Sequence, residues 1–364
     1  MIKQLKQFTV NLMAGANVAT VLLMLLVGYS DRISPAEHPL LSSIGMTFPA
    51  FLLANLLFLF FWLIFKWRKA WIPVVGYLLA YVPISIYIPL NKPGDTEEAS
   101  LKLVSWNVCC YGGGRTDTDY FEDICGYLKE QKADIVCLQE DVDSWRGYFF
   151  REYAKVYPYN DTTVFCKNSQ TMNGLGIHSR YPILKKERIE YESVGNGSVA
   201  YYLKVGADTL LVINNHLEGT HLTKADRLRY TDMLRGNMNR DTARAESRFL
   251  LGKLGVSSAK RAPQAEAVHR YVADHSRYPI ILCGDFNDTP ISYSRHTIAE
   301  GLTDCFSKSG NGLGLSYNQK GFYFRIDHIF CSSHYEPLSC QVDSKIHYSD
   351  HYPVVCWLKK RNNP

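Results

Sequence analysis

Residues that could do chemistry lie at the ends of short apolar runs throughout the chain beyond residue 100. Such runs are typical of buried strands. The polar residues at or beside their ends are Asn107, Glu140, His216, Asp285, Asn287, Asp327, Asp350 and His351. Because a sheet places successive strand ends along one rim, we expect these side chains to converge. Carboxylate and amide oxygens bind hard divalent cations, and two histidines beside them could hold an anion or transfer a proton.

The stretch ILCGDFNDTP shows the pattern most clearly. Residues i and i+2 of an extended strand share a face, so Asp285 and Asn287 are expected to point together while Phe286 enters the core. The same rule separates Asp327 from His328, which we interpret as structural.

Helices are expected between these runs, at 118–131, 224–250, 262–275 and 290–300. The last has Thr289 as its expected N-cap and Pro290 at its first position. Asp288 is interpreted as a cap of that helix and not as a metal ligand.

The first 92 residues are predicted to be a membrane anchor. Three apolar stretches lie at 8–28, 44–65 and 71–90. Each has about 20 residues, the length that spans the hydrocarbon core of a bilayer. A cleaved signal peptide is the alternative for the first stretch, but no small-residue cleavage pattern follows it. Residues 93–100 are interpreted as a linker to a domain at 101–358, which is followed by a tail at 359–364.

Basic residues indicate the orientation of the anchor. Lys3 and Lys6 precede the first apolar stretch, and Lys66, Arg68 and Lys69 lie between the second and third. By the positive-inside rule both segments are cytoplasmic, so the domain is expected on the opposite side. In a bacterium this predicts a multi-pass protein of the inner membrane with a periplasmic domain.

Charge bears on the partner. The first 92 residues hold seven Lys/Arg and two Asp/Glu, which leaves 33 of each kind in the rest of the chain. A nucleic-acid-binding domain normally has a basic excess, so this balance gives nucleic acid no support. One basic segment, 224–261, could meet an anionic surface or be a solvated helix face. The ten cysteines include no pair with zinc-site spacing, and their apolar settings mildly disfavour an oxidising compartment.

Seven fragments, in order, resemble the endonuclease/exonuclease/phosphatase superfamily. They are SWNV, DIVCLQE, GLGIHSRYPI, NNHLEG, GDFND, RIDHIF and SDHYPVV, and all lie within 101–358. The superfamily includes DNase I, AP endonucleases, neutral sphingomyelinases, inositol polyphosphate phosphatases and CCR4-type deadenylases. The resemblance implies an α/β (α+β) fold, a four-layer α/β/β/α sandwich of two mixed β-sheets. Here it would follow three transmembrane helices.

The resemblance also implies a metal site at one edge of the sandwich. Glu140 would be the principal ligand of Mg²⁺, assisted by Asn107, with Asp350 near the metal. Mn²⁺ would be a possible substitute.

The remaining roles would be catalytic. Asp285 would orient or deprotonate the attacking water, and Asn287 would hold that water or a phosphate oxygen. His351 would sit over the phosphate, oriented by Asp327. His216 would be a second phosphate clamp or the general acid.

The substrate is less well indicated than the chemistry. A neutral domain tethered beside a bilayer favours a lipid or lipid-linked phosphate ester, whereas the basic segment favours a membrane-tethered nuclease acting on DNA or RNA. Arg261 and Asn215 are further candidates for substrate binding. A catalytically silent binding module is the third alternative, and the presence of Glu140, Asp285 and His351 argues against it. The lipid bilayer is the expected partner of residues 1–92, and no protein partner is inferable.

Overall fold

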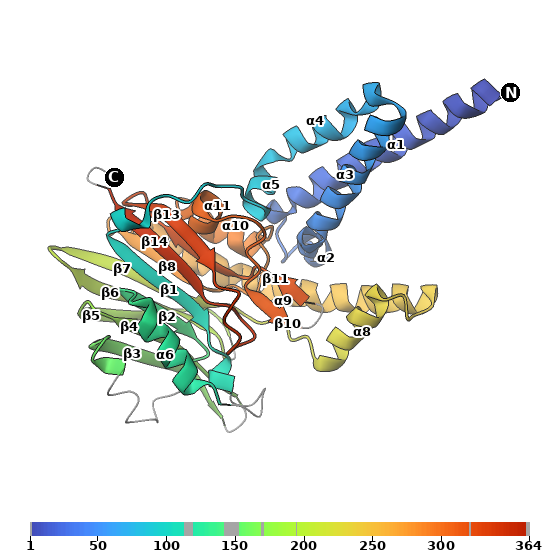
Figure 1. Ribbon diagram of the computed structural model, residues 1–364. Coiled ribbons are helices and arrows are strands. Elements are labelled where there is room, and N and C mark those ends of the chain that lie inside the picture. Colours follow the sequence, from blue (N-terminus) through green and yellow to red (C-terminus); the bar gives the residue numbers. More distant parts are fainter. Residues whose placement is uncertain are drawn as a thin grey trace.

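The structure is a computed structural model that describes residues 2–112, 119–141, 153–168, 171–193, 195–319 and 322–361. Figure 1 shows the helices of the N-terminal part beside a domain built on β-sheets. The last three residues of the expected tail lie outside the described ranges.

One sheet has six strands in the order β13-β14-β1-β2-β4-β3. Their bounds are β1 Leu101–Asn107, β2 Ile135–Gln139, β3 Tyr159–Asn168, β4 Thr171–Ser179, β13 Tyr335–Val342 and β14 Val354–Lys360. β1 and β2 run parallel and the other neighbours antiparallel, so the sheet is mixed.

The other six-stranded sheet has the order β5-β6-β7-β8-β12-β9. Its strands are β5 Ile183–Ile189, β6 Gly197–Val205, β7 Asp208–His216, β8 Ile280–Asp285, β9 Thr303–Asp304 and β12 Asp327–Cys331. β7 and β8 are its parallel pair. A ribbon of β10 (Tyr317–Gln319) and β11 (Phe322–Phe324) stands apart.

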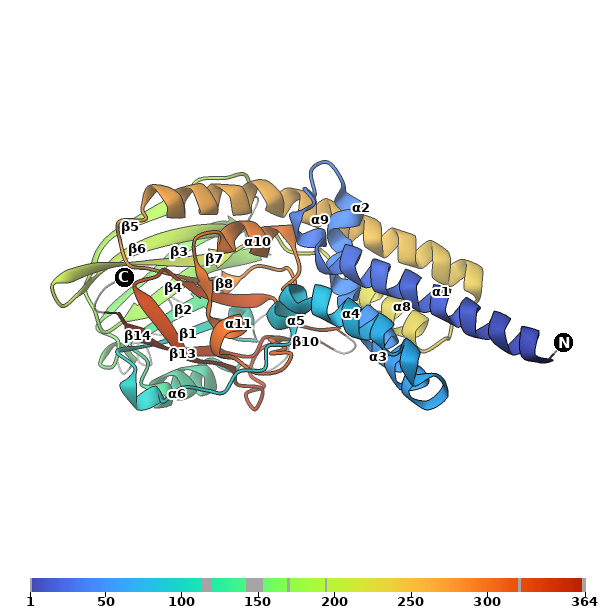
Figure 2. The ribbon, with the colours of Figure 1, turned by 90° about the horizontal axis from the view of Figure 1, so that it is seen from above.

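Alternating side chains fill three apolar layers. Leu103 and Ile281 belong to the core between the two sheets, whereas Val104 faces α6 (Phe121–Gln131). Ile213 belongs to a third layer beneath α9 (Arg240–Asp274) and α10 (Tyr293–Ala299). Figure 2 shows α6 and α9 on opposite sides of the sheets. The arrangement is consistent with the expected four-layer sandwich.

Two of the expected helices, 224–250 and 262–275, have different bounds in the structure. Residues 224–250 divide into α8 (Lys224–Leu234) and the start of α9, which then continues without a break to Asp274 and so includes nearly all of the helix expected at 262–275. Pro263 lies inside α9. A proline usually ends a helix, but Ala265 and Val268 just after it are buried in the layer beside the sheet, and this packing outweighs the missing backbone hydrogen bond.

The expected start of the 290–300 helix was wrong. α10 begins at Tyr293, and the Ser292 hydroxyl is its N-cap acceptor, so neither Thr289 nor Pro290 starts it. Asp288 does not cap this helix. Its Oδ2 accepts hydrogen bonds from Arg261 Nε at 3.0 Å and from Ser294 Oγ at 3.2 Å.

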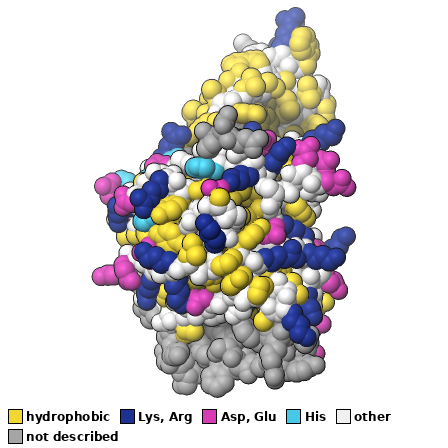
Figure 3. Space-filling model, turned by 90° about the vertical axis from the view of Figure 1, so that its left-hand side faces the viewer, with side chains coloured by type: hydrophobic (Ala, Val, Ile, Leu, Met, Phe, Trp, Pro, Cys, Tyr) yellow, Lys and Arg dark blue, Asp and Glu magenta, His cyan; other side chains and the backbone are white. Residues whose placement is uncertain are grey.

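Two segments of the described chain, Ile2–Arg32 and Pro39–Phe65, are long and apolar enough to cross a membrane. They contain α1 (Ile2–Gly28), α2 (Pro39–Ser42) and α3 (Phe48–Phe65). Apolar side chains of the N-terminal part crowd the upper part of Figure 3, whereas basic and acidic side chains are interspersed on the domain below. Short 3-10 helices lie at Ser30–Arg32, Ser43–Thr47, Trp67–Lys69, Thr96–Glu98 and Cys109–Gly112.

The third expected span, 71–90, is not one straight helix. It consists of α4 (Trp71–Leu79) and α5 (Tyr81–Tyr87), bent by 65°. Pro83 has no N–H to donate to the Leu79 carbonyl, which accepts a hydrogen bond from the Tyr29 hydroxyl at 2.8 Å instead. The pair counts as a third candidate span only if both helices are taken together.

The anchor is hydrogen bonded to the domain. Asn91 Nδ2 donates to the carbonyls of Ser307 and Gly310, in and just after α11 (Cys305–Ser309), at 3.0 and 2.9 Å. The N–H of Gly94 donates to the Leu338 carbonyl of β13 at 2.8 Å. The segment interpreted as a linker is therefore attached to the sheet at its beginning.

Candidate active site

The pairing of strands brings the polar strand ends together. Asp327 of β12 is directly opposite Asp285 of β8, and His216 of β7 pairs with Asp285 from the other side. In the facing sheet, Asn107 is the last residue of β1 and pairs with Gln139, the last residue of β2. Glu140 comes directly after β2. The two sheets therefore meet in a polar edge, as the sequence predicts.

The Asp285 carboxylate lies at the centre of this cluster. Its Oδ2 accepts a hydrogen bond from Asn107 Nδ2 at 3.0 Å, and it lies 3.6 Å from His351 Nε2 and 3.7 Å from His216 Nε2. Burial raises the pKa of Asp285, the two histidines oppose this rise, and the Asp327 carboxylate adds to it. A carboxylate with a raised pKa is a better proton acceptor than a solvated one.

His351 forms a close pair with Asp327, with 2.8 Å between Nδ1 and Oδ2. Burial would lower the pKa of His351, but the Asp327 and Asp285 carboxylates raise it to about 10. The backbone is also held, because the His351 carbonyl accepts from Trp106 Nε1 at 2.9 Å. The imidazole therefore stays cationic at neutral pH in one orientation.

Glu140 follows β2 with a left-handed backbone, φ +53°, which is uncommon for a residue with a side chain. Its Oε1 accepts from Asn107 Nδ2 at 3.2 Å, and that same amide nitrogen contacts Asp285. Asn107 Oδ1 accepts from the N–H of Cys109 at 3.0 Å. In this arrangement Asn107 links the two carboxylates through its nitrogen, and its oxygen faces the backbone.

Asn287 does not follow the strand alternation by which it was expected to point with Asp285. β8 ends at Asp285, and Asn287 has φ +52°, so it does not continue the extended strand. Its N–H donates to Asp285 Oδ1 at 2.8 Å, and its Nδ2 donates to the Leu217 carbonyl at 3.0 Å. Asn287 therefore joins the site through a turn. Phe286 is fully buried, as expected.

Asp350 is buried next to His351, and its carbonyl accepts from the N–H of Asn318 at 2.8 Å. Its role as a metal ligand stays a prediction.

Arg261 and Asn215, the two candidates for substrate binding, are buried and hydrogen bonded within the domain. Arg261 is buried and donates to Asp288, to the Glu218 carbonyl and to Ser258 Oγ, each at 3.0 Å. Asn215 is fully buried, and its Nδ2 donates to the Cys283 carbonyl at 3.0 Å. These contacts favour positioning over contact with a substrate.

Asn173 is a site residue that the sequence reasoning missed. Its Oδ1 lies 3.3 Å from His216 Nδ1. On β4, Asn173 shares the inward face with Leu175 and Ile177, both in the core between the sheets. A polar residue in line with two inward apolar residues is a signal that could have identified it.

Among the described residues, one group of carboxylates and histidine has the geometry of a metal site. Ligand atoms of Asp285, Asp327 and His351 lie within 4.8 Å of one another. In this group His351 Nδ1 is already paired with Asp327 Oδ2. The half-buried Glu140 carboxylate beside Asn107 is the better fit for a hard cation, which prefers oxygen ligands.

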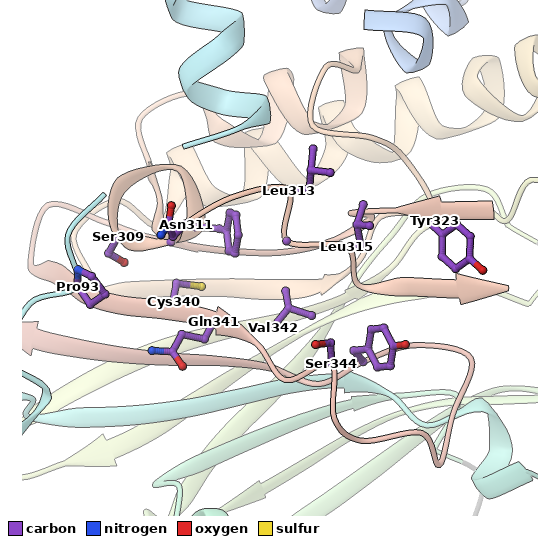
Figure 4. A pocket seen from close by; sticks show the side chains of 14 residues that line it. Pro93, Ser309, Asn311, Leu313, Leu315, Tyr323, Cys340, Gln341, Val342 and Ser344 are labelled. Atoms are coloured by element: carbon purple, nitrogen blue, oxygen red, sulfur yellow. The ribbon is translucent and has the colours of Figure 1, made fainter. Parts of the chain in front are cut away.

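Figure 4 shows a pocket of about 580 Å³ near Pro93, Leu313 and Val342. Its lining includes Tyr352 but none of the candidate catalytic residues. We therefore do not assign it to the reaction.

Two family models match parts of the chain. A model described as the Endonuclease/Exonuclease/phosphatase family matches residues 104–351. A second model, described only as a domain of unknown function, matches residues 10–87.

The chain is similar to two curated proteins. An exodeoxyribonuclease of Bacillus subtilis (strain 168) is 32% identical over 104 residues, which cover 26% of this chain and 40% of that protein. The CCR4-Not complex 3'-5'-exoribonuclease subunit Ccr4 of Phaeosphaeria nodorum is 30% identical over 129 residues, which cover 29% of this chain and 21% of that protein. The chain thus matches less than half the length of either relative.

Solved structures share the fold. An endonuclease/exonuclease/phosphatase from Bacteroides vulgatus aligns with a TM-score of 0.50 and 15% identity, covering 72% of this chain and 99% of that one. A functionally unknown conserved protein from Enterococcus faecalis V583 aligns with a TM-score of 0.51 and 14% identity, covering 72% and 100%. The family model spans more than half of the chain, so the chain belongs to the endonuclease/exonuclease/phosphatase family, whose members are metal-dependent hydrolases of phosphate esters.

Proposed function

We propose that the chain is a Mg²⁺-dependent phosphoesterase that cleaves a phosphodiester or phosphomonoester close to a membrane. The observation that carries the proposal is the buried Asp285 carboxylate, which is contacted by Asn107, His216 and His351. A carboxylate surrounded in this way can accept a proton, and it lies beside groups that can bind an anion.

Asp285 is the proposed general base. Its raised pKa suits it to take a proton from an attacking water. The N–H of Asn287 holds Asp285 Oδ1, which leaves Oδ2 toward the histidines. Water attack in line with the leaving oxygen then requires a phosphate held beside Oδ2.

His351 is the proposed phosphate clamp, because its pairing with Asp327 keeps it cationic. His216 is bonded to Asn173 through Nδ1 and directs Nε2 toward Asp285. Either histidine can donate the proton that the leaving oxygen requires.

Glu140, with Asn107 and Asp350, would hold the Mg²⁺ ion. The bound ion would neutralise charge on the non-bridging phosphate oxygens. The Asn107 amide nitrogen now donates to both carboxylates; with a cation bound, the opposite orientation of this amide would direct its oxygen toward Glu140.

The membrane part of the proposal keeps three spans at about 8–28, 44–65 and 71–90, the last of them bent, with residues 93–100 as the connection to the domain. The two long apolar helices support it. The positions of Lys3, Lys6 and Arg68 support a domain on the side opposite the cytoplasm. A lipid or lipid-linked phosphate ester is then the favoured substrate.

Hydrolysis of bis-p-nitrophenyl phosphate by the full chain in detergent tests the chemistry. We expect turnover with Mg²⁺, little turnover with EDTA, and at least a hundredfold loss of kcat in Asp285→Asn. Asp123→Asn, which changes an exposed carboxylate on α6, is the matched control and should keep full activity. Equal rates under all these conditions would favour a catalytically silent binding module.

A membrane-tethered nuclease is the second candidate, because both curated relatives carry nuclease names. Plasmid DNA, RNA, sphingomyelin and a phosphoinositide should be assayed in parallel. Cleavage of nucleic acid without cleavage of lipid would replace the favoured substrate class and leave the proposed chemistry in place.

A further inference from the structure

α8 and the first half of α9 form an antiparallel helical hairpin, residues 224–256, which extends from the domain on the same side as the anchor (Figures 1 and 2). Lys253 Nζ contacts Asp226 Oδ2 at 2.6 Å, and Arg229 Nη1 contacts Glu246 Oε2 at 3.4 Å. These contacts join the two helices, so the hairpin is a built element of the fold.

The base of the hairpin packs against the connection between the two long apolar helices. A Cβ added at Gly255 would lie 2.9 Å from the Pro39 carbonyl oxygen, so the backbones approach closely there. Ser258 Oγ lies 3.5 Å from Ser43 Oγ. Pro39 is the first residue of one candidate membrane span, so the base of the hairpin lies beside the N-terminal end of that span.

The hairpin carries an excess of positive charge, with eight Lys/Arg against four Asp/Glu. Arg240, Arg244 and Arg248 are spaced four residues apart and form a row along α9. All three are exposed, and within the described part of the chain none has a carboxylate partner. This row is free to bind anions.

An apolar row lies beside the arginines. Ala245, Phe249, Gly252 and Val256 share one face of α9 by their helical spacing. The side chain of Phe249 is 46% exposed and that of Val256 is 60% exposed. On α8, Leu228 is 65% exposed. The Phe249 ring also contacts Arg229 and Lys253 of the hairpin. Leu228 and Val256 are therefore the exposed apolar side chains that suit an apolar partner.

We propose that the hairpin binds the phosphate groups of anionic lipids that surround the anchor. The arginine row matches the headgroup charge, and the apolar row suits the boundary between headgroups and acyl chains. The close packing at Gly255 makes this surface continuous with the anchor. Nucleic acid would use the arginines but would leave Val256 and Leu228 unexplained, so lipid is favoured.

Lipid retention by the full chain tests this surface. Protein purified in dodecyl maltoside is incubated with equal amounts of phosphatidylglycerol and phosphatidylcholine, exchanged into lipid-free detergent, and the retained lipids are quantified. The wild type should retain more phosphatidylglycerol than phosphatidylcholine. The triple variant with Arg240, Arg244 and Arg248 each changed to Gln should lose this excess by on the order of tenfold.

Two controls make the result decisive. The triple variant with Arg180, Arg188 and Arg277 changed to Gln removes three arginines that lie away from the hairpin and should keep the excess. Changing Arg240, Arg244 and Arg248 to Lys keeps the charge and should also keep it, which guards against misfolding.

An unchanged excess in the Gln variant of the hairpin would overturn the proposal. A second outcome would also overturn it: the wild type binds a single-stranded DNA oligonucleotide in preference to phosphatidylglycerol in 150 mM NaCl, and the Gln variant does not bind the oligonucleotide. The surface would then be a nucleic-acid site. The lipid measurement needs no turnover, so it is independent of the hydrolysis test.

Discussion

Asp327 contributes most among the carboxylates to the positive charge of His351, and its Oδ2 lies 2.8 Å from Nδ1. In Asp327→Asn the imidazolium loses its nearest carboxylate, so the pKa of His351 should fall from about 10 toward its ordinary value of 6.5. We expect kcat to fall by about 10²- to 10³-fold, and the alkaline limb of the pH–rate profile to move to lower pH.

The measurement is kcat for the chromogenic diester from pH 6 to pH 10.5. His351→Gln should be equally slow and should lack that limb altogether. An alkaline limb at the same pH in Asp327→Asn and in the wild type would contradict a cationic His351.

His328 has the structural role expected from the sequence. It is buried, its Nε2 lies 3.2 Å from the Asp288 carbonyl oxygen, and its ring centroid is 5.1 Å from that of Phe286. Burial lowers the pKa of His328 from 6.5 to about 4. The unfolded chain therefore binds the proton more readily than the folded one, and stability present above pH 6.5 is lost as the pH falls toward 4.

We expect acidification from pH 7.5 to 4 to cost on the order of 3 kcal/mol through this residue. The thermal midpoint of His328→Gln should be lower at pH 7.5 but should fall less on acidification than that of the wild type. His269→Gln changes a half-buried histidine on α9 and should behave as the wild type does. An identical fall in His328→Gln would show that other groups carry the acid sensitivity.

At the residue scale, the sequence predicted which side chains meet but not how each of them arrives. The apolar pattern sets strand register, and register places Asp285 opposite both Asp327 and His216. The left-handed backbone of Asn287 depends on contacts with Leu217, which is about 70 residues away and cannot be read from local alternation. The chemical roles stay predictions.

At the element scale, α9 joins the outer layer of the domain to the active-site loop. Arg261 projects from α9 to Asp288, three residues after Asp285. Removing one member of a buried ion pair leaves the other charge uncompensated, so Arg261→Met should cost about 3 kcal/mol of unfolding free energy.

Asp288→Asn should also destabilise, and the double variant should cost less than both single changes together, because the two residues share one interaction. Denaturant midpoints followed by tryptophan fluorescence measure this. Arg277→Gln, an exposed change just beyond α9, is the control. Additive costs would mean that the two side chains act independently.

The bounds of the helices were the least predictable feature. Thr289 and Pro290 carry the composition of a helix start, but Asp288 is held by Arg261 and Ser294, which delays α10 until Ser292 can cap it. Local preference was overruled by contacts that only the folded chain makes.

At the scale of the whole molecule, the positions of basic residues predict the side on which the domain lies. Alkaline phosphatase fused after the last residue should be active in bacteria, because it folds only outside the cytoplasm, and a green fluorescent protein fused at the same point and exported by the Sec route should stay dark. The same two reporters fused after Arg68 should give the opposite result. A fluorescent, phosphatase-inactive C-terminal fusion would place the domain in the cytoplasm.

The fold class and the apolar N-terminal part could be read from the sequence, but the path of the third apolar stretch could not. Its composition suits a single span, and the 65° bend arises where Pro83 cannot pair with Leu79 and Tyr29 does. The number of apolar residues in the stretch does not indicate that the Tyr29 hydroxyl will bond to the Leu79 carbonyl.

The hydrogen bonds of Asn91 and Gly94 restrict movement of the anchor relative to the domain. On the proposed membrane arrangement, the active site is therefore held at one height above the bilayer and cannot swing outward. Such an enzyme would respond to how densely its substrate covers the surface, and diluting the same substrate in the surrounding volume would matter little. An insertion between residues 94 and 100 would lie beyond these two contacts along the chain, so it would leave the site at the same height.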